Sequence, residues 1–506
     1  MFTIGKWKLE IKKEWKIAFI ATWIVGLLAH AYRFFNFLPI WDSIYNFTGV
    51  GSTYTLGRWF LPYAGLISSI FDLPWVNGAL SLLYISIVMI LLIEMFQIRN
   101  KGLIVVSAAV FASFPTVVST FAYMYTADCY MLAFLLAVLA IFLTWRVKKW
   151  GMPLGIVALA FAMGIYQAYA TCAIMMVLLY IIKQFAVEKM SLIDAIKKDL
   201  KYLGTLVGGL VLYLIILKLT LWHYNMNLAG YQGIGDMGIM SLAEYKAALL
   251  KTKARFTYML GLEYGIINRP YTIINVVILV MIAVLLVYFV VKNRVFEKKL
   301  SLLALVVAVM LLPVGAYTVF FISPSVEYYT LMEMGLCFLY FLLIVLLNQI
   351  EWKAYLPKLL SVIGTVAICA LAYYNVLNSN IAYYNLNLSY HKSYAVAENI
   401  LDRIEDREEF GTVTKKVAMI GVYECPTENL ISMVPAIMGI SDDSFLNDPN
   451  HYQIFWNYCF GIQTELATYD EMHAIMETEE YKNMPIYPAK GSLQCINDII
   501  VVRLSE

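Results

Sequence analysis

Two aspartates could act as general bases, because each lies among aromatic residues at the end of an apolar segment. Asp42 follows the first apolar segment and is the only acid between Glu14 and Asp72. Asp128 closes the tyrosine-rich stretch 121–128. A carboxylate partly withdrawn from water has a raised pKa and can accept a proton near neutral pH. Two simpler interpretations stay open: Asp42 could merely face water, and Asp128 could be an acid favoured by the dipole at a helix start.

Uncharged polar and aromatic side chains around these aspartates could bind a substrate. Gln167 is the most informative, since it interrupts an apolar run at 164–169 and its amide needs hydrogen-bond partners there. Tyrosines are common at membrane interfaces, so their presence alone indicates less. The candidates near the aspartates are Tyr45, Tyr123, Thr126, Tyr166, Gln167 and Tyr169. A glycine-rich turn at 230–236 adds Tyr231 and Gln232, and no strand precedes it as a dinucleotide fingerprint would require.

Three cationic side chains could hold a phosphate through charge-assisted hydrogen bonds. Arg58 lies in the loop that also holds Asp42. Lys251 and Arg255 are four residues apart in a predicted helix, residues 241–262, so they share one face. Unspecific contact with lipid headgroups is the alternative for this pair. Glu327, an acid between two later apolar runs, is a further candidate for binding substrate.

The elements that carry these residues are predicted to be membrane helices. Of 506 residues, 61% are hydrophobic and 14% charged, whereas about 25% are charged in ordinary globular chains. A helix needs roughly 20 apolar residues to cross a bilayer. The apolar runs cover 17–38, 78–97, 102–120, 129–146, 152–164, 170–184, 203–221, 271–291, 300–321, 331–348 and 358–375. We expect a mainly α membrane protein with about eleven transmembrane helices, the first retained because no cleavage site follows it.

The distribution of lysine and arginine predicts the orientation. Alternate connections are rich in both residues: 97–101, 146–149, 183–201, 292–299 and 353–358. The connections 115–128, 164–170 and 322–330 contain neither, whereas the long connection 222–270 breaks the pattern with five such residues. Positive segments stay in the cytoplasm, so the N-terminus is expected inside and the tail outside. This alternation holds only if the polar break at 164–169 separates two short helices.

The tail is expected to form a small α/β domain on the outer face. A charged helix over 395–409 and strands over 415–422 and 498–504 are predicted there. The resulting division is a transmembrane catalytic domain, 1–375, and an extracytoplasmic domain, 376–506. A disulfide between Cys425 and Cys495 is one option outside the cell. No Cys/His spacing indicates a metal site, and no basic stripe indicates nucleic-acid binding.

The residue types gathered on the predicted outer side fit transfer of a sugar from a lipid phosphate, because cations suit a phosphate whereas aromatics and carboxylates suit a sugar. A transporter or flippase for lipid-linked sugars would place charges deep within several helices, and these helices hold few. A non-catalytic membrane scaffold stays open. A membrane acyltransferase would need a histidine in an apolar helix, for which His30 is the nearest fit.

Four short segments, taken in order, resemble the type II glucosyltransferase family, the Gtr-type enzymes that modify O-antigen, and their Gram-positive relatives. The matching segments are the Asp42 loop with Gly57-Arg58-Trp59, the stretch from Tyr123 to Asp128, the break from Gly164 to Tyr169, and the tail start with Tyr383-Tyr384, Lys392-Ser393-Tyr394-Ala395 and Asp402-Arg403-Ile404-Glu405. The resemblance spans nearly the whole chain.

This resemblance implies a GT-C-like architecture and an inverting hexosyltransferase of the bacterial cytoplasmic membrane. The donor would be a polyprenyl-phosphate-linked sugar, with glucose the expected hexose, and the acceptor a cell-surface glycan such as O-antigen or teichoic acid. GT-C enzymes place a catalytic acid in the first outer loop, which corresponds to Asp42, with Asp128 as the second outer acid. Ser43 follows Asp42 where an acidic pair would mark the base more strongly, so either aspartate stays a candidate. No cofactor is implied, although a divalent cation could assist, and membrane lipids surround the protein.

Overall fold

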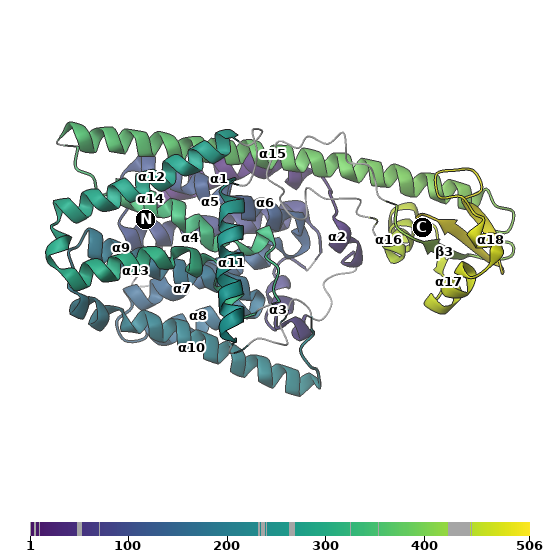
Figure 1. Ribbon diagram of the computed structural model, residues 1–506, viewed down its shortest axis with the longest axis horizontal. Coiled ribbons are helices and arrows are strands. Elements are labelled where there is room, and N and C mark those ends of the chain that lie inside the picture. The colour runs from purple at the N-terminus through teal and green to yellow at the C-terminus, as the bar shows by residue number, and fades with distance from the viewer. Residues whose placement is uncertain are drawn as a thin grey trace.

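The computed structural model describes residues 2–4, 7–9, 11–47, 53–69, 71–230, 233, 238, 240–262, 269–323, 325–352, 354–423, 446 and 448–505. The chain is mainly helical, as the composition predicts, and its longest helices pack side by side in one bundle (Figure 1). Within these residues, nine helical segments are long and apolar enough to cross a membrane, and two shorter apolar helices, Gly151–Ile165 and Met334–Leu347, accompany them. The protein is therefore a membrane protein.

All eleven apolar runs of the sequence fall on helices of this bundle. The helices are α1 (Lys13–Phe35), α4 (Pro74–Phe96), α5 (Lys101–Ala112), α6 (Pro115–Ala122), α7 (Met124–Arg146), α8 (Gly151–Ile165), α9 (Ala170–Ala186), α10 (Leu192–Tyr224), α12 (Arg269–Lys292), α13 (Lys299–Ala316), α14 (Cys337–Leu347) and α15 (Tyr355–Glu405). The number of membrane crossings stays a prediction.

The helical path breaks at two places, each for a local reason. The run 102–120 divides into α5 and α6 because Pro115 opens α6 and holds the preceding Phe114 in an extended conformation. The runs 152–164 and 170–184 form α8 and α9, two separate helices as the polar break predicts. A single 3-10 turn, Gln167–Tyr169, joins them after Tyr166, which is extended at φ −157°.

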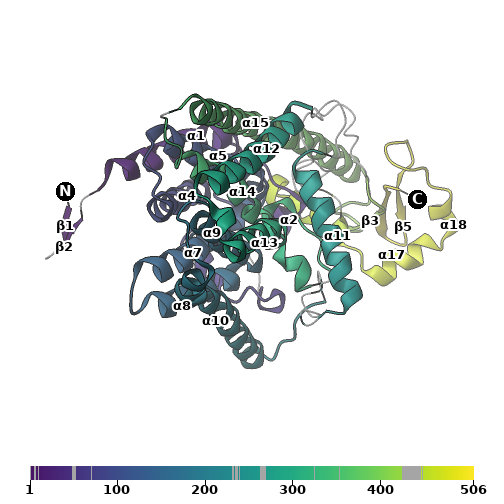
Figure 2. The same cartoon turned by 60° about the vertical axis from the view of Figure 1, so that its left-hand side comes forward.

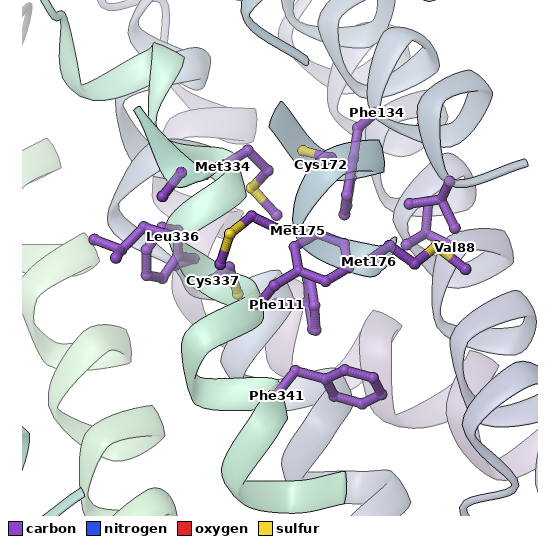
Figure 3. Packing of buried hydrophobic residues seen from close by; sticks show 14 of the residues in the cluster. Val88, Phe111, Phe134, Cys172, Met175, Met176, Met334, Leu336, Cys337 and Phe341 are labelled. Atoms are coloured by element: carbon purple, nitrogen blue, oxygen red, sulfur yellow. The ribbon is translucent and has the colours of Figure 1, made fainter. Parts of the chain in front are cut away.

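Aromatic and sulfur-containing side chains fill the centre of the bundle (Figure 3). Phe111 of α5 contacts Phe341 of α14, with ring centroids 5.7 Å apart and the rings at 72°. Cys172 and Cys337 are buried among these rings and methionines as free thiols, so they serve as small apolar fillers. This dense packing holds the helix ends that carry the site.

Short elements cover one end of the bundle. They are α2 (Trp41–Tyr45), the turn Tyr54–Leu56, α3 (Leu61–Gly65) and α11 (Leu242–Met259). Helix α11 lies across the bundle helices (Figure 1). It begins with a capping box, in which Ser241 Oγ accepts from the backbone of Glu244 and the Glu244 carboxylate accepts from the backbone of Ser241. A hairpin of β1 (Phe2–Ile4) and β2 (Trp7–Leu9), which the sequence did not predict, lies away from the bundle (Figure 2).

Helix α15 continues without a break from the bundle into the tail (Figure 1). The expected domain boundary at residue 375 therefore falls inside one helix. The tail strands, in spatial order, are β4 (Glu465–Leu466), β3 (Lys416–Ile420), β6 (Ile499–Arg503) and β5 (Leu493–Ile496). Strand β3 is parallel to β4 and β6, whereas β5 and β6 form a hairpin.

The sheet buries both of its faces, because side chains alternate along each strand. Val417 and Ile500 belong to the apolar cluster that α15 shares with α16 (Pro449–Phe455). Ala418 and Val501 belong to the cluster on the opposite face, with α17 (Tyr469–Met476) and α18 (Glu479–Lys482). The two predicted strands, 415–422 and 498–504, correspond to β3 and β6.

Candidate active site

A cavity of about 480 Å³, which we call the polar cavity because an acid, a cation and several hydroxyl groups line it, opens between the short elements and the nearby ends of the bundle helices. It brings together five of the residues that the sequence singled out, Asp42, Arg58, Tyr123, Thr126 and Tyr166. Other described residues that line it are Trp41, Asn46, Thr53, Leu56, Leu61, Tyr125, Tyr130, Tyr329 and Leu331. The cavity thus combines one acid and one cation within aromatic walls.

Asp42 supplies the acid of this cavity from the one-turn helix α2. The turn is fixed locally, because the Asn46 side chain donates a 2.7 Å hydrogen bond to the Asp42 carbonyl oxygen. Burial raises the pKa of the Asp42 carboxyl to about 6, and the positive charge of Arg58 opposes part of that rise. The carboxyl can therefore accept a proton near neutral pH.

Arg58 supplies the cation, and aromatic rings fix its direction. Its guanidinium lies 4.5 Å from the centre of the Tyr166 ring, and its Nη1 donates to the Tyr130 hydroxyl at 3.2 Å. Tyr130 and Tyr166 stack on each other with centroids 4.8 Å apart. A cation over an aromatic face in a partly desolvated site gains about 0.5–2 kcal/mol. The rings therefore hold the guanidinium in place without neutralising its charge.

The loop that carries Arg58 is fastened to the helix break at Gln167. Gln167 Nε2 donates to the Leu56 carbonyl oxygen and to the Tyr213 hydroxyl, both at 2.9 Å. Tyr213 in turn donates to the Gly57 carbonyl oxygen at 3.1 Å. Gly57 has φ +72°, and a Cβ there would lie 2.5 Å from Gln167 Nε2. The polar break therefore supplies the hydrogen-bond partners that the Arg58 loop requires.

An apolar groove of about 520 Å³ adjoins the polar cavity. Its walls come from α8, α9 and α10 and from the stretch 318–332, with Leu159, Leu206 and Leu210 among the lining residues. Arg58, Tyr166 and Tyr329 line both spaces. The guanidinium thus lies where an apolar groove meets a polar cavity that contains an acid.

A model of the family described as Glucosyl transferase GtrII matches residues 31–340. This chain belongs to that family. It is therefore a glycosyltransferase, with a sugar donor and an acceptor as substrates. The match extends from α1 to α14 and includes every described residue that lines the cavity and the groove. No curated protein and no solved structure matches the chain.

Asp128 has different surroundings from Asp42 in this GtrII-family chain. Its carboxylate is buried and accepts a 3.0 Å hydrogen bond from Asn77 Nδ2. The Asn77 amide oxygen accepts a 3.1 Å hydrogen bond from the backbone N–H of Leu73, the residue just before α4. Asp128 is not among the described residues that line the cavity. The contacts indicate that Asp128 joins α7 to α4.

Arg255 and Lys251 lie together on α11, as their spacing predicts, but on neither cavity wall among the described residues. Arg255 forms a two-pronged ion pair with the fully buried Glu333, at 2.5 Å from Nε and 3.3 Å from Nη2. Lys251 lies 5.7 Å from the centre of the Phe320 ring. The Arg255 charge is thus matched by the Glu333 carboxylate.

The remaining predicted site residues are dispersed. Glu327 is exposed and lines the groove. Gln167 also lines the groove. Tyr45 contacts the tail instead of the cavity. Tyr169 is buried with its ring centroid 6.3 Å from that of Tyr130. Tyr231 and Gln232 lie outside the described residues.

His30, the residue considered for acyl transfer, has both ring nitrogens engaged. Nε2 lies 2.7 Å from the Ala112 carbonyl oxygen and Nδ1 lies 2.8 Å from the Tyr383 hydroxyl. Because a carbonyl only accepts, Nε2 carries the proton and Nδ1 accepts from Tyr383. His30 therefore links α1, α5 and α15 inside the bundle.

The described residues contain no group of three or more His, Cys, Asp or Glu side chains able to hold a metal ion. Cys425, the proposed partner of Cys495, lies outside the described residues.

A buried ion pair that the sequence did not predict joins Arg33 of α1 to Asp72, with Nη2 and Oδ2 3.3 Å apart. One feature of the sequence could have revealed this pair: Arg33 is a lone arginine inside an apolar run, where a buried charge is costly and needs a partner of opposite charge.

Proposed function

We propose that this GtrII-family protein is an inverting, GT-C-like hexosyltransferase. It would move a sugar, glucose by family resemblance, from a polyprenyl phosphate to a cell-surface glycan. The observation that carries the proposal is the position of Arg58, where the apolar groove meets the polar cavity of Asp42. A lipid-phosphate sugar has the same three parts in the same order: an apolar chain, an anion and a polar sugar.

The donor would lie across this junction. Its chain would occupy the groove beside α8 and α10, where Leu159, Leu206 and Leu210 offer apolar contact. Its phosphate would bind the Arg58 guanidinium, which has several donors for phosphate oxygens. The sugar would then enter the polar cavity, whose tyrosine rings can pack against its C–H faces. Lys251 and Arg255 are less suited to the phosphate, because Arg255 already binds Glu333.

Asp42 would act as the general base. Its carboxylate would take the proton of an acceptor hydroxyl as that oxygen attacks the anomeric carbon. The new C–O bond forms while the bond from the anomeric carbon to the phosphate oxygen breaks, and the lipid phosphate leaves as an anion stabilised by Arg58. One displacement inverts the anomeric configuration. No residue or metal has to form a covalent intermediate.

Helix geometry favours Asp42 over Asp128 for this role. Thr126 and Tyr130 are four residues apart on α7 and both line the cavity. Asp128 lies two residues from each, which turns it by about 200° to the other side of the helix. There it meets Asn77. We therefore assign Asp128 a structural role.

The reaction would occur at the outer face of the bacterial cytoplasmic membrane. The lysine-rich segments that join α7 to α8 and α9 to α10 lie at the end of the bundle away from α2, the helix of Asp42 (Figure 1). Under the positive-inside rule that end is cytoplasmic. The N-terminus would then lie inside, and the cavity and tail outside, where a flipped lipid-linked donor and a surface glycan meet.

The test is transfer from a synthetic polyprenyl-phosphate glucose to surface glycan by purified protein. Asp42→Asn should lower kcat by about 10²–10⁴-fold, the usual contribution of a general base. Asp128→Asn is the matched control, because an amide oxygen can still accept from Asn77. It should stay within a few-fold of wild type when normalised to folded protein. Near wild-type activity of Asp42→Asn with an intact fold would overturn the mechanism.

A further inference from the structure

A separate cavity of about 340 Å³ lies at the opposite end of the bundle. Helices α7, α9 and α10 contribute residues to both ends. Along α7, Tyr130 lines the polar cavity and Trp145 lines this one. Fifteen residues of helix separate them by about 22 Å. We call this space the lysine cavity; it is lined by Met95, Gln97, Trp145, Tyr180, Lys183, Glu188, Lys198, Lys201 and Tyr202.

Two lysines of the lysine cavity have no carboxylate within ion-pair distance among the described residues. They are Lys198 and Lys201, one turn apart on α10. Each is held over a tyrosine ring, Lys198 at 5.4 Å from the Tyr180 centroid and Lys201 at 5.0 Å from the Tyr202 centroid. The third lysine, Lys183, is buried and pairs with Glu188 at 3.1 Å. The aromatic rings orient Lys198 and Lys201 without cancelling their charges.

Two further observations indicate that an anion belongs here. Tyr202 is fully buried, and its hydroxyl has no hydrogen-bond partner of normal geometry among the described residues. The charges do not balance either. The three lysines carry +3, whereas Glu188 and the neighbouring Asp199, which accepts from Gln184 at 3.2 Å, carry −2. One positive charge is left, and one phosphodiester would balance it.

We propose that the lysine cavity binds a phosphate group, independently of the reaction proposed for the opposite end. Lys198 and Lys201 would donate to the phosphate oxygens, and the Tyr202 hydroxyl would donate a third hydrogen bond. Both lysines directly precede the apolar stretch 203–221 of α10. Headgroups lie at this depth in a bilayer, and basic pockets between membrane helices bind anionic lipids there. The phosphate source is either such a headgroup or a soluble phosphate.

Native mass spectrometry of the full-length, delipidated protein tests the proposal. Phosphatidylglycerol is added to wild type, to Lys198→Gln/Lys201→Gln and to Lys148→Gln/Lys149→Gln. The last variant is the matched control, because it removes the same charge from exposed lysines between α7 and α8 that do not line the cavity. Diacylglycerol with the same acyl chains controls for apolar binding. Inorganic phosphate, titrated by calorimetry, tests the soluble source.

The expected result is at least a fivefold loss of bound phosphatidylglycerol in Lys198→Gln/Lys201→Gln alone. Tyr202→Phe, which leaves the charge unchanged, should lose about threefold. If inorganic phosphate does not displace the bound phosphatidylglycerol, the ligand is a lipid headgroup. If inorganic phosphate itself binds in calorimetry, and the Lys198→Gln/Lys201→Gln variant loses this binding, the ligand is a soluble phosphate. Equal losses in both lysine variants, or no phosphate binding of either kind, would overturn the proposal.

Discussion

The ring of Tyr45 meets the ring of His451 edge-on, with centroids 4.5 Å apart. This contact joins α2, the helix of Asp42, to α16 of the tail. The neighbouring Ile44 is fully buried, and it belongs to the apolar cluster of the tail that includes Trp456. Asp42 lies only two residues before Ile44. The tail therefore holds the backbone that places the candidate base.

Loss of the Ile44 side chain should reduce turnover in addition to stability, whereas loss of an equally buried side chain elsewhere in the tail should reduce stability alone. Ile44→Ala leaves a gap between α2 and the tail, so Asp42 loses its fixed position, and we expect kcat to fall about tenfold or more. Ile475→Ala is the matched control, because Ile475 is equally buried on the other face of the tail sheet. Both changes cost about 2–5 kcal/mol locally. Steady-state kinetics and thermal unfolding of both variants check this; equal kcat values would refute a positioning role.

The pH dependence of turnover should report the Asp42 carboxyl. Its pKa is raised to about 6, and the base acts only when ionised, so kcat should fall as pH decreases through about 6. Arg58 lowers this pKa, so Arg58→Gln should move the midpoint to higher pH, in addition to weakening donor binding. A pH series of kcat for wild type and Arg58→Gln measures both midpoints. A downward shift in the variant would contradict the assigned electrostatics.

The same raised pKa predicts a stability effect with a definite sign. The folded protein binds this proton more tightly than the unfolded chain, so Asp42 lowers the free energy of unfolding as pH rises from about 4 to about 6. Asp42→Asn removes that penalty. The inactive variant should therefore unfold at a higher temperature than wild type at pH 8, and the difference should vanish near pH 4. A lower unfolding temperature at pH 8 would contradict this expectation.

Substitution of Gly57 should disconnect Arg58 from its support. A Cβ at this position would lie 2.5 Å from Gln167 Nε2 and 2.6 Å from the Tyr213 hydroxyl, and φ +72° is unfavourable for alanine. We expect Gly57→Ala to raise KM for the donor several-fold, since the phosphate-binding guanidinium moves. Gly411→Ala, also at positive φ but with no atom within 4 Å of its Cβ, is the matched control. Donor saturation curves distinguish the two.

Local patterns predicted the helices, but the pairing of distant residues was not accessible from the sequence. Hydropathy located each apolar run, and the polar break at Gln167 correctly divided α8 from α9. The sequence alone could have shown that Asp128 points away from Thr126, because two residues along a helix correspond to a rotation of about 200°. The partner of Arg255 was not, because Glu333 follows it by 78 residues and nothing local connects them.

Breaking the ion pair between Arg255 and Glu333 should destabilise the fold. Arg255→Met leaves a fully buried carboxylate without its cation, which typically costs about 3–5 kcal/mol. Arg255→Met/Glu333→Leu removes both charges and should recover most of the loss. Thermal unfolding in detergent measures both variants. If Arg255→Met instead keeps its stability and loses donor binding, the phosphate contact predicted from the spacing of Lys251 and Arg255 is correct.

The length of the donor's lipid chain should matter through the groove. Leu210 lines the groove on α10, whereas Leu203, two turns earlier on the same helix, is exposed and does not. Leu210→Trp fills part of the 520 Å³ and should raise KM for a long-chain donor by about tenfold. A short-chain donor, which reaches less far along the groove, should be affected less.

Leu203→Trp controls for the added bulk on α10 and should leave both KM values unchanged. The ratio of KM for long-chain and short-chain donors is the decisive quantity, because general damage to the helix raises both values together. A change of ratio in Leu210→Trp alone supports a lipid chain in the groove. An unchanged ratio would show that the lipid chain lies outside the groove. It would therefore contradict the proposal that Arg58 binds the phosphate between the lipid chain and the sugar.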